Sequence, residues 1–220
     1  MTDWSALTLE PMVAASPIWI QLLDTFTGRP PAGAVRVSIE RRVDDGWRAI
    51  TQRHQVSAAG DLTFVNLGRT RDPEATGTFD VRIFVDCPGS IPEALGGEAA
   101  VTKTITAWAP DAPDVPLLPD ALRLFPGPSY AFPSGTPLLA GQVIDAHGDP
   151  APRARVSATA TVQNTLLTEE VRSDGAGRFR LPLRWSAGIT DVRATRGAQA
   201  GSITVSLPAD LSSTHQITLT

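Results

Sequence analysis

The residues of this chain best suited to catalysis or metal binding are its histidines and its one cysteine. His54, His147 and His215 lie far apart in the sequence, and neither an HxH nor an HExxH spacing occurs. A zinc site or a Ser-His-Asp triad needs side chains that converge. Cys87 stands before Pro88 with no base placed beside it, and a lone cysteine is most often a small buried hydrophobe. The sequence therefore predicts no catalytic residue, no metal site and no cofactor, and we expect the protein not to be an enzyme.

Three aspartates form the most suggestive acidic group. Asp145, Asp149 and Asp174 lie near turns that a β-fold can bring to one end of a domain. Loop carboxylates bind Ca²⁺ in many proteins. The same residues also close turns by bonding their own backbone N–H groups. We favour turn formation, with a calcium site as the alternative.

Lys103, the only lysine, lies in a segment of alternating polar and apolar residues. It shares a face of that segment with Val101 and Ile105. Some β-sandwich surface proteins form an amide bond between a lysine and an asparagine, and Asn66 would be the partner here. The reading we favour is an edge-strand lysine that blocks aggregation.

Composition narrows the class of protein. The chain has 220 residues, 42% of them hydrophobic, which is enough for a packed core in one large or two small domains. A net charge of −4 without a basic cluster excludes the usual footprint of nucleic-acid binding. One cysteine excludes an internal disulfide. The N-terminus lacks a basic region and no apolar run reaches eighteen residues, so we expect no signal peptide, no membrane insertion and synthesis in the cytoplasm.

Short runs of alternating apolar and polar residues, bounded by Gly, Pro, Asp and Asn, predict strands along the whole chain. In the first half these runs are 17–25, 34–42, 47–54, 61–67, 78–86 and 100–108. In the second half they are 138–146, 154–162, 165–173, 178–185, 189–196, 201–208 and 215–220. Many short strands at this spacing favour an all-β fold of two tandem transthyretin-like or Ig-like sandwiches.

The strand pattern divides the chain into four parts. We expect an N-terminal arm at 1–16, a first sandwich at 17–108, a Pro-rich connector at 109–137 and a second sandwich at 138–220. Each proline removes a ladder donor, so the connector should not supply a central strand. It is not rich in Gly and Ser, so it should be stiff and hold the two domains in a fixed relation.

An internal repeat supports the tandem arrangement. The segment DTFTGRPPAGAVRVS (24–38) corresponds to DAHGDPAPRARVS (145–157), and AAGDLTF (58–64) corresponds to GAGRFRL (175–181). The tripeptide DVR then recurs at 80–82 and 191–193. Because the matches keep their order, we interpret the halves as two copies of one sandwich.

The second copy resembles the carboxypeptidase regulatory-like domain, a seven-stranded transthyretin-like sandwich. The resemblance covers 138–220 and rests on two turn patterns, with Arg153 where a glycine is usual; the matching residues are Asp145, Gly148, Pro150, Ala154 and Val156, then Asp174, Gly175, Gly177, Phe179 and Leu181. It implies a non-catalytic module that is appended to other proteins or used in assembly. The related hydrolases of hydroxyisourate carry His-rich signatures and a terminal Tyr-Arg-Gly-Ser, which this chain lacks.

These features favour a structural or adaptor protein of a larger assembly. A product without an export signal fits a phage virion or tail, or a phage-derived contractile injection particle. Its expected partners are other protein subunits, including further copies of this chain. The residues we expect to dock on a partner lie in the arm: Trp4, Leu7, Leu9 and Met12. The alternative reading of the arm is a frayed terminus or a strap on its own domain.

The alternative function is a peptide- or carbohydrate-binding β-sandwich of the adhesion type, exported by a non-classical route. Exposed aromatic residues gathered at one end of a sandwich would favour it.

Overall fold

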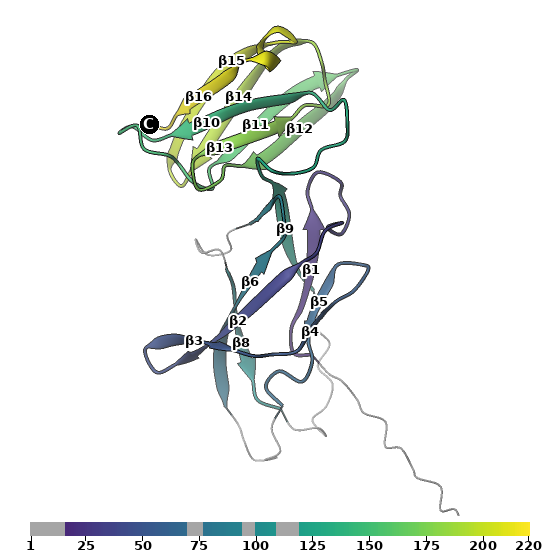
Figure 1. Ribbon diagram of the computed structural model, residues 1–220, viewed down its shortest axis with the longest axis vertical. Coiled ribbons are helices and arrows are strands. Elements are labelled where there is room, and N and C mark those ends of the chain that lie inside the picture. Colours follow the sequence, from purple (N-terminus) through teal and green to yellow (C-terminus); the bar gives the residue numbers. More distant parts are fainter. Residues whose placement is uncertain (1–15, 70–76, 94–99, 109–118) are drawn as a thin grey trace, which may run out of the picture.

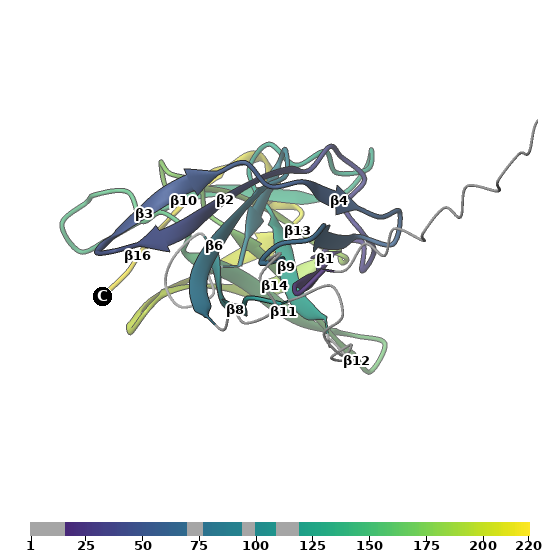
Figure 2. The same ribbon diagram turned by 90° about the horizontal axis from the view of Figure 1, so that it is seen from below.

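The computed structural model describes residues 16–69, 77–93, 100–108 and 119–220. Within these ranges the one helical element is a single 3-10 turn, η1 (Ala209–Ser212), and no helix is long and apolar enough to cross a membrane. The strands form two sandwiches stacked along the long axis (Figure 1), one behind the other when viewed from below (Figure 2). The predicted all-β class with tandem sandwiches is confirmed.

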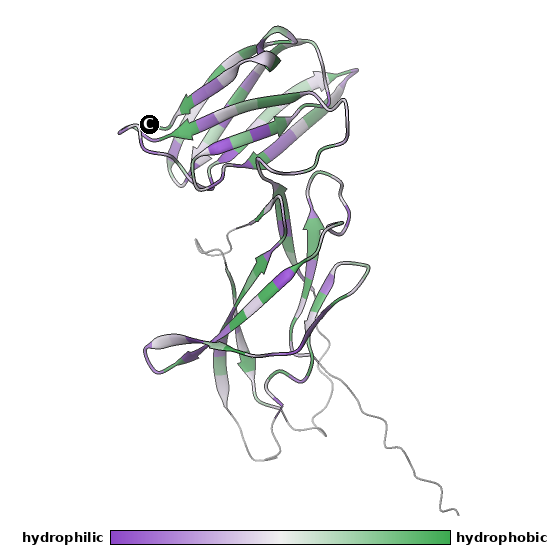
Figure 3. Ribbon diagram, in the orientation of Figure 1, coloured by the Kyte–Doolittle hydropathy of each residue, from purple (hydrophilic) through white to green (hydrophobic). Residues whose placement is uncertain are grey.

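The first sandwich pairs a sheet of order β4-β5-β1-β9-β7 with a sheet of order β3-β2-β6-β8. Its strands are β1 (Trp19–Asp24), β2 (Arg36–Val43), β3 (Gly46–Ile50), β4 (His54–Val56), β5 (Asp61–Phe64), β6 (Thr78–Asp86), β7 (Ser90–Pro92), β8 (Ala100–Thr106) and β9 (Asp120–Pro126). Hydrophobic residues alternate with polar ones along these strands (Figure 3). Ile20, Leu22, Ile83 and Leu124 are among the core side chains, and all are buried.

The second sandwich pairs a sheet of order β13-β10-β16 with a sheet of order β12-β11-β14-β15. Its seven strands are β10 (Leu138–Ile144), β11 (Arg155–Val162), β12 (Thr165–Arg172), β13 (Arg178–Pro182), β14 (Gly188–Arg196), β15 (Gln199–Leu207) and β16 (Thr214–Thr218). Phe179, Leu181, Val192 and Ile217 belong to a separate core. Each sandwich therefore buries its own apolar surface.

The pairing of strands confirms that the two halves share one topology. β1 pairs antiparallel with β5 and parallel with β9, and β10 pairs in the same way with β13 and β16. β2 lies between β3 and β6, as β11 lies between β12 and β14. The strands β4 and β7 have no counterpart in the second copy, and each lies at an outer edge of its sheet.

Matched glycines anchor the repeat at the same point of both copies. Leu22 N donates to Gly60 O at 2.9 Å, and Val143 N donates to Gly177 O at 2.8 Å. Both glycines have positive φ, +84° and +74°. A Cβ on Gly177 would lie 2.3 Å from Val143 O, so only glycine fits there without strain.

The expected connector requires one correction. Residues 120–126 form β9, which lies between β1 and β7 inside a sheet of the first sandwich. Pro119 precedes the strand and Pro126 is its last residue, so the residues from 120 to 125 all keep their backbone N–H donors. Leu22 pairs with Leu122 in register. The first sandwich thus takes its last strand from the stretch expected as a linker.

Candidate functional site

The three histidines occupy separate places in the structure. His54 lies in β4, where its ring approaches Phe64 at a centroid distance of 6.2 Å. His147 lies in the turn after β10, and His215 lies in β16 with Nε2 2.8 Å from Asp210 O. Within the described ranges no three His, Cys, Asp or Glu side chains are grouped for metal binding.

Of the three aspartates predicted to form turns, Asp145 and Asp174 do so through their carboxylates, and Asp149 takes part through its backbone. Asp145 Oδ1 accepts from His147 N at 2.9 Å and from Asp149 N at 3.1 Å. Asp174 Oδ1 accepts from Ala176 N at 2.9 Å and from a second backbone N–H in the same turn at 2.8 Å. The hydrogen bond from His147 N is the main cause that lowers the pKa of Asp145. Both carboxylates are therefore engaged in closing turns.

Lys103 faces the inside of the sandwich, on the side predicted for it. Its Nζ lies 2.5 Å from Asp120 Oδ2, so an ion pair links β8 of one sheet to β9 of the other. Asn66, the residue considered as an amide-bond partner, has φ +57° and a buried Oδ1 without a hydrogen bond. The contact that the structure gives Lys103 is thus an inter-sheet ion pair.

Cys87 is 3% exposed and belongs to the core of the first sandwich. Burial raises the pKa of its thiol, against a hydrogen bond to Ser90 that lowers it. A protonated buried thiol is a poor nucleophile.

The docking residues predicted in the arm, Trp4, Leu7, Leu9 and Met12, lie outside the described residues, and their role stays a prediction.

The strongest feature that sequence reasoning missed is the junction between the sandwiches. Phe125, near the end of β9, is fully buried, and two guanidinium groups lie close to its ring. Arg172 Cζ of β12 lies 4.4 Å from the ring centroid, and Arg123 Cζ lies 4.8 Å from it. Arg172 also approaches Glu170 at 3.5 Å, while burial lowers the pKa of its guanidinium. In this way β12 of the second sandwich packs against β9 of the first.

An aromatic cluster continues the junction on the chain that leads into the second sandwich. Phe26, Tyr130 and Phe132 contact one another with ring centroids 4.8 to 5.8 Å apart. Tyr130 Oη donates to Asp24 Oδ2 at 2.5 Å, and burial together with this bond raises the pKa of the phenol. Arg180 of β13 stacks 5.7 Å from the Phe132 ring. Its Nη1 also donates to the carbonyl of residue 128 at 3.0 Å.

A third contact crosses from the second sandwich to a turn of the first. Arg184 Nη2 donates to Phe26 O at 3.3 Å. Its Nε lies 2.7 Å from Glu169 Oε1, within ion-pair distance although without hydrogen-bond geometry. Glu169 is 4% exposed, and burial raises its pKa against the opposing effect of Arg184. A buried acid therefore orients the arginine that reaches the neighbouring domain.

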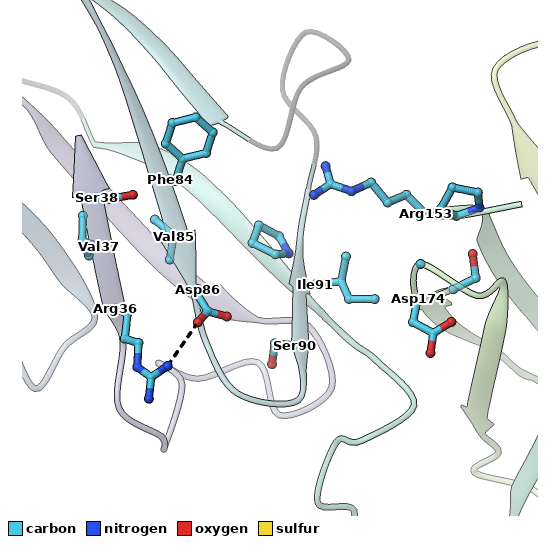
Figure 4. A pocket seen from close by; sticks show the side chains of 14 residues that line it. Arg36, Val37, Ser38, Phe84, Val85, Asp86, Ser90, Ile91, Arg153 and Asp174 are labelled. Atoms are coloured by element: carbon cyan, nitrogen blue, oxygen red, sulfur yellow. Dashed lines mark ion pairs between the residues drawn. The ribbon is translucent and has the colours of Figure 1, made fainter. Parts of the chain in front are cut away.

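Beside this junction lies an open cleft of about 680 Å³. One wall consists of the adjoining ends of β2 and β6 together with β7, and the other consists of turns 152–153 and 173–175. Figure 4 shows Arg153 reaching from the second sandwich towards the first, with Phe84 and Ile91 on the opposite wall. Clefts of this size between domains are common ligand sites.

Comparisons with known proteins give fold similarity only. No protein-family model and no curated protein matches the chain, so the carboxypeptidase regulatory-like assignment is not confirmed. Among solved structures, a Streptococcal ancillary pilin matches 96% of this chain and 64% of its own length, at 10% identity and TM-score 0.35. The shaft pilin SpaA from Lactobacillus rhamnosus GG matches 94% of this chain and 97% of its own length, at 11% identity and TM-score 0.31.

The Bacillus anthracis TIE protein matches 94% of this chain at 14% identity and TM-score 0.28, and the chain spans 34% of that protein's length. The chain thus spans less than two thirds of both the ancillary pilin and the TIE protein. At these identities and TM-scores the account of function rests on the contacts within this chain.

Proposed function

We propose that this chain is a non-catalytic structural module, in which two sandwiches act as one rigid spacer between binding partners. The observation that carries the proposal is the junction. Three arginines of the second sandwich, Arg172, Arg180 and Arg184, contact the first sandwich or the chain leaving it at separate points.

The placement of these contacts opposes bending. Arg172 comes from β12, Arg180 from β13 and Arg184 from the segment after β13, so a motion that separates these elements from the first sandwich must break the contacts. A desolvated cation–π contact is worth about 2 kcal/mol. Domains joined only by a flexible linker would lack such contacts and would move freely.

Small-angle X-ray scattering of the full chain tests the rigidity. We expect the scattering of the wild type to fit a single conformation. The variant Arg172→Ser/Arg180→Ser/Arg184→Ser should fit only an ensemble with a larger radius of gyration. A matched control, Arg193→Ser, changes an arginine of β14 that is outside the junction contacts described above and should scatter like the wild type. An ensemble fit for the wild type itself would refute the proposal.

A binding module of the adhesion type is the second candidate function. The cleft beside the junction favours it, because partly exposed Phe84 and Ile91 face an open space there. A role in a phage virion or tail or in a contractile injection particle stays a prediction of the sequence.

A further inference from the structure

The first and last strands of each sandwich lie side by side and run in the same direction (Figure 1). In the first sandwich, residues 20–24 of β1 pair with residues 120–124 of β9. In the second sandwich, residues 140–144 of β10 pair with residues 214–218 of β16. All other pairs of labelled strands in the described part of the chain are antiparallel.

This arrangement decides how a pulling force acts on each sandwich. A force along the chain pulls the first strand towards its N-terminal end and the last strand towards its C-terminal end. Because the two strands are parallel, these pulls are opposite along one axis, and the strands must slide past each other to separate. The hydrogen bonds of a parallel ladder cross between the strands at even spacing, so they resist the slide together. An antiparallel pair that is pulled apart from one end opens bond by bond instead.

Hydrogen bonds and buried side chains strengthen both parallel ladders. Thr25 N donates to Leu124 O at 3.0 Å just after β1, and a backbone bond of 2.8 Å joins residues 219 and 144 just after β16. Leu22 is paired with Leu122, and both side chains are at most 2% exposed. A slide of one residue breaks the register and takes such side chains out of the core.

Neighbouring strands keep the paired strands from peeling away sideways. β1 lies between β5 and β9, β9 lies between β1 and β7, and β10 lies between β13 and β16. β16 is at the edge of its sheet, but two backbone bonds between Thr220 and Ala200, of 3.1 and 3.3 Å, tie the chain after it to β15.

We propose that this chain bears tension, with each sandwich clamped between the strand that enters it and the strand that leaves it. This inference rests on the proposed structural function and names the load that the module carries. A pull on β1 passes through the β1–β9 ladder, along residues 127–137, and then through the β10–β16 ladder. The two clamps therefore lie in series along the chain.

One protein pulled along two lines tests the proposal in optical tweezers. It is the full chain with Cys87→Ala/Ile189→Cys/Ser206→Cys and a peptide tag at each end, held either through the tags or through the two thiols. Ile189 and Ser206 are exposed and paired with each other in the antiparallel pair β14–β15. Pulling through the thiols opens that pair from one end. The stability of the protein is the same in both cases, so only the direction of the load differs.

Pulling through the tags should give two sharp rupture events in each molecule, one for each sandwich. The two gains in length should differ, because the first sandwich spans more of the chain, 19–126, than the second, 138–218. Both events should need at least about three times the force that opens β14–β15 at the same pulling speed, since several paired positions share the load instead of one.

The proposal is overturned if the tagged ends rupture at the same force as the thiols, or if the chain lengthens gradually without sharp events. If the thiol variant melts below the wild type, Asp191→Cys/Thr204→Cys moves the handles to the next exposed pair of the same two strands. The scattering experiment measures bending of the free chain. A flexible junction with strong clamps, or a rigid junction with weak ones, would therefore separate the two proposals.

Discussion

Single residues decide where each copy of the sandwich turns. Gly60 and Gly177 hold equivalent places beside the first strand of each copy, and both accept a backbone N–H while φ is positive. The repeat of AAGDLTF and GAGRFRL predicts this equivalence from sequence alone. The close approach of Gly177 to Val143 O could not be read from the sequence, because it depends on how β10 packs on that turn.

The Gly177→Ala change should strongly destabilise the second sandwich. The left-handed backbone costs about 1–2 kcal/mol for alanine, and overpacking against Val143 O adds about 1–3 kcal/mol. The control Gly148→Ala also has positive φ, but its Cβ would meet open space. Gly148→Ala should therefore lose only the cost of the left-handed backbone, about 1–2 kcal/mol. Urea unfolding compares the two variants, and equal losses would show that the close contact has no energetic role.

Glu169 makes stability depend on pH in a stated direction. Burial raises its pKa in the folded state, so the folded chain binds this proton more tightly than the unfolded chain. The contribution of Glu169 to stability is therefore most favourable below its ordinary pKa and declines as pH rises through the raised value. As the pH rises from 4 to 7, the Glu169→Gln variant should therefore become more stable relative to the wild type, because glutamine does not ionise. Urea unfolding at both pH values measures this, and a relative gain on acidification instead would contradict the assignment.

At the scale of elements, the alternation of apolar residues predicts thirteen runs, and a strand of the structure lies within or overlaps every one of them. The strands β4 and β7 span only three residues each, too short for a period of two to be recognised. β9 escaped prediction because the prolines in and around this stretch suggested a linker, although the one proline within the strand, Pro126, is its last residue.

The Lys103–Asp120 ion pair joins β8 to β9 across the two sheets. Its side chains are 32% and 44% exposed, so water screens the attraction. A double-mutant cycle with Lys103→Met and Asp120→Asn should give a coupling energy below about 1 kcal/mol that shrinks with added salt. The intact mass should equal that of the unmodified sequence. A loss of ammonia or water from that mass would reveal a covalent cross-link instead of an ion pair.

At the scale of the whole molecule, the junction and the cleft arise only from tertiary packing. Phe125 and Arg172 lie 47 positions apart in the sequence, and the cleft draws on five separate segments. No local pattern relates such residues. The sequence predicts two domains held in a fixed relation, but the side chains that hold them could be found only from the packed structure.

The distance between the two sandwiches is the most direct test of the central claim that they form one rigid body. Spin labels at Gln55→Cys and Thr161→Cys, in a Cys87→Ala background, place one probe on each sandwich at exposed positions. Double electron–electron resonance should give one narrow distance distribution, which broadens when Arg180 and Arg184 are both changed to Ala. A broad or two-peaked distribution with both arginines in place would contradict the account.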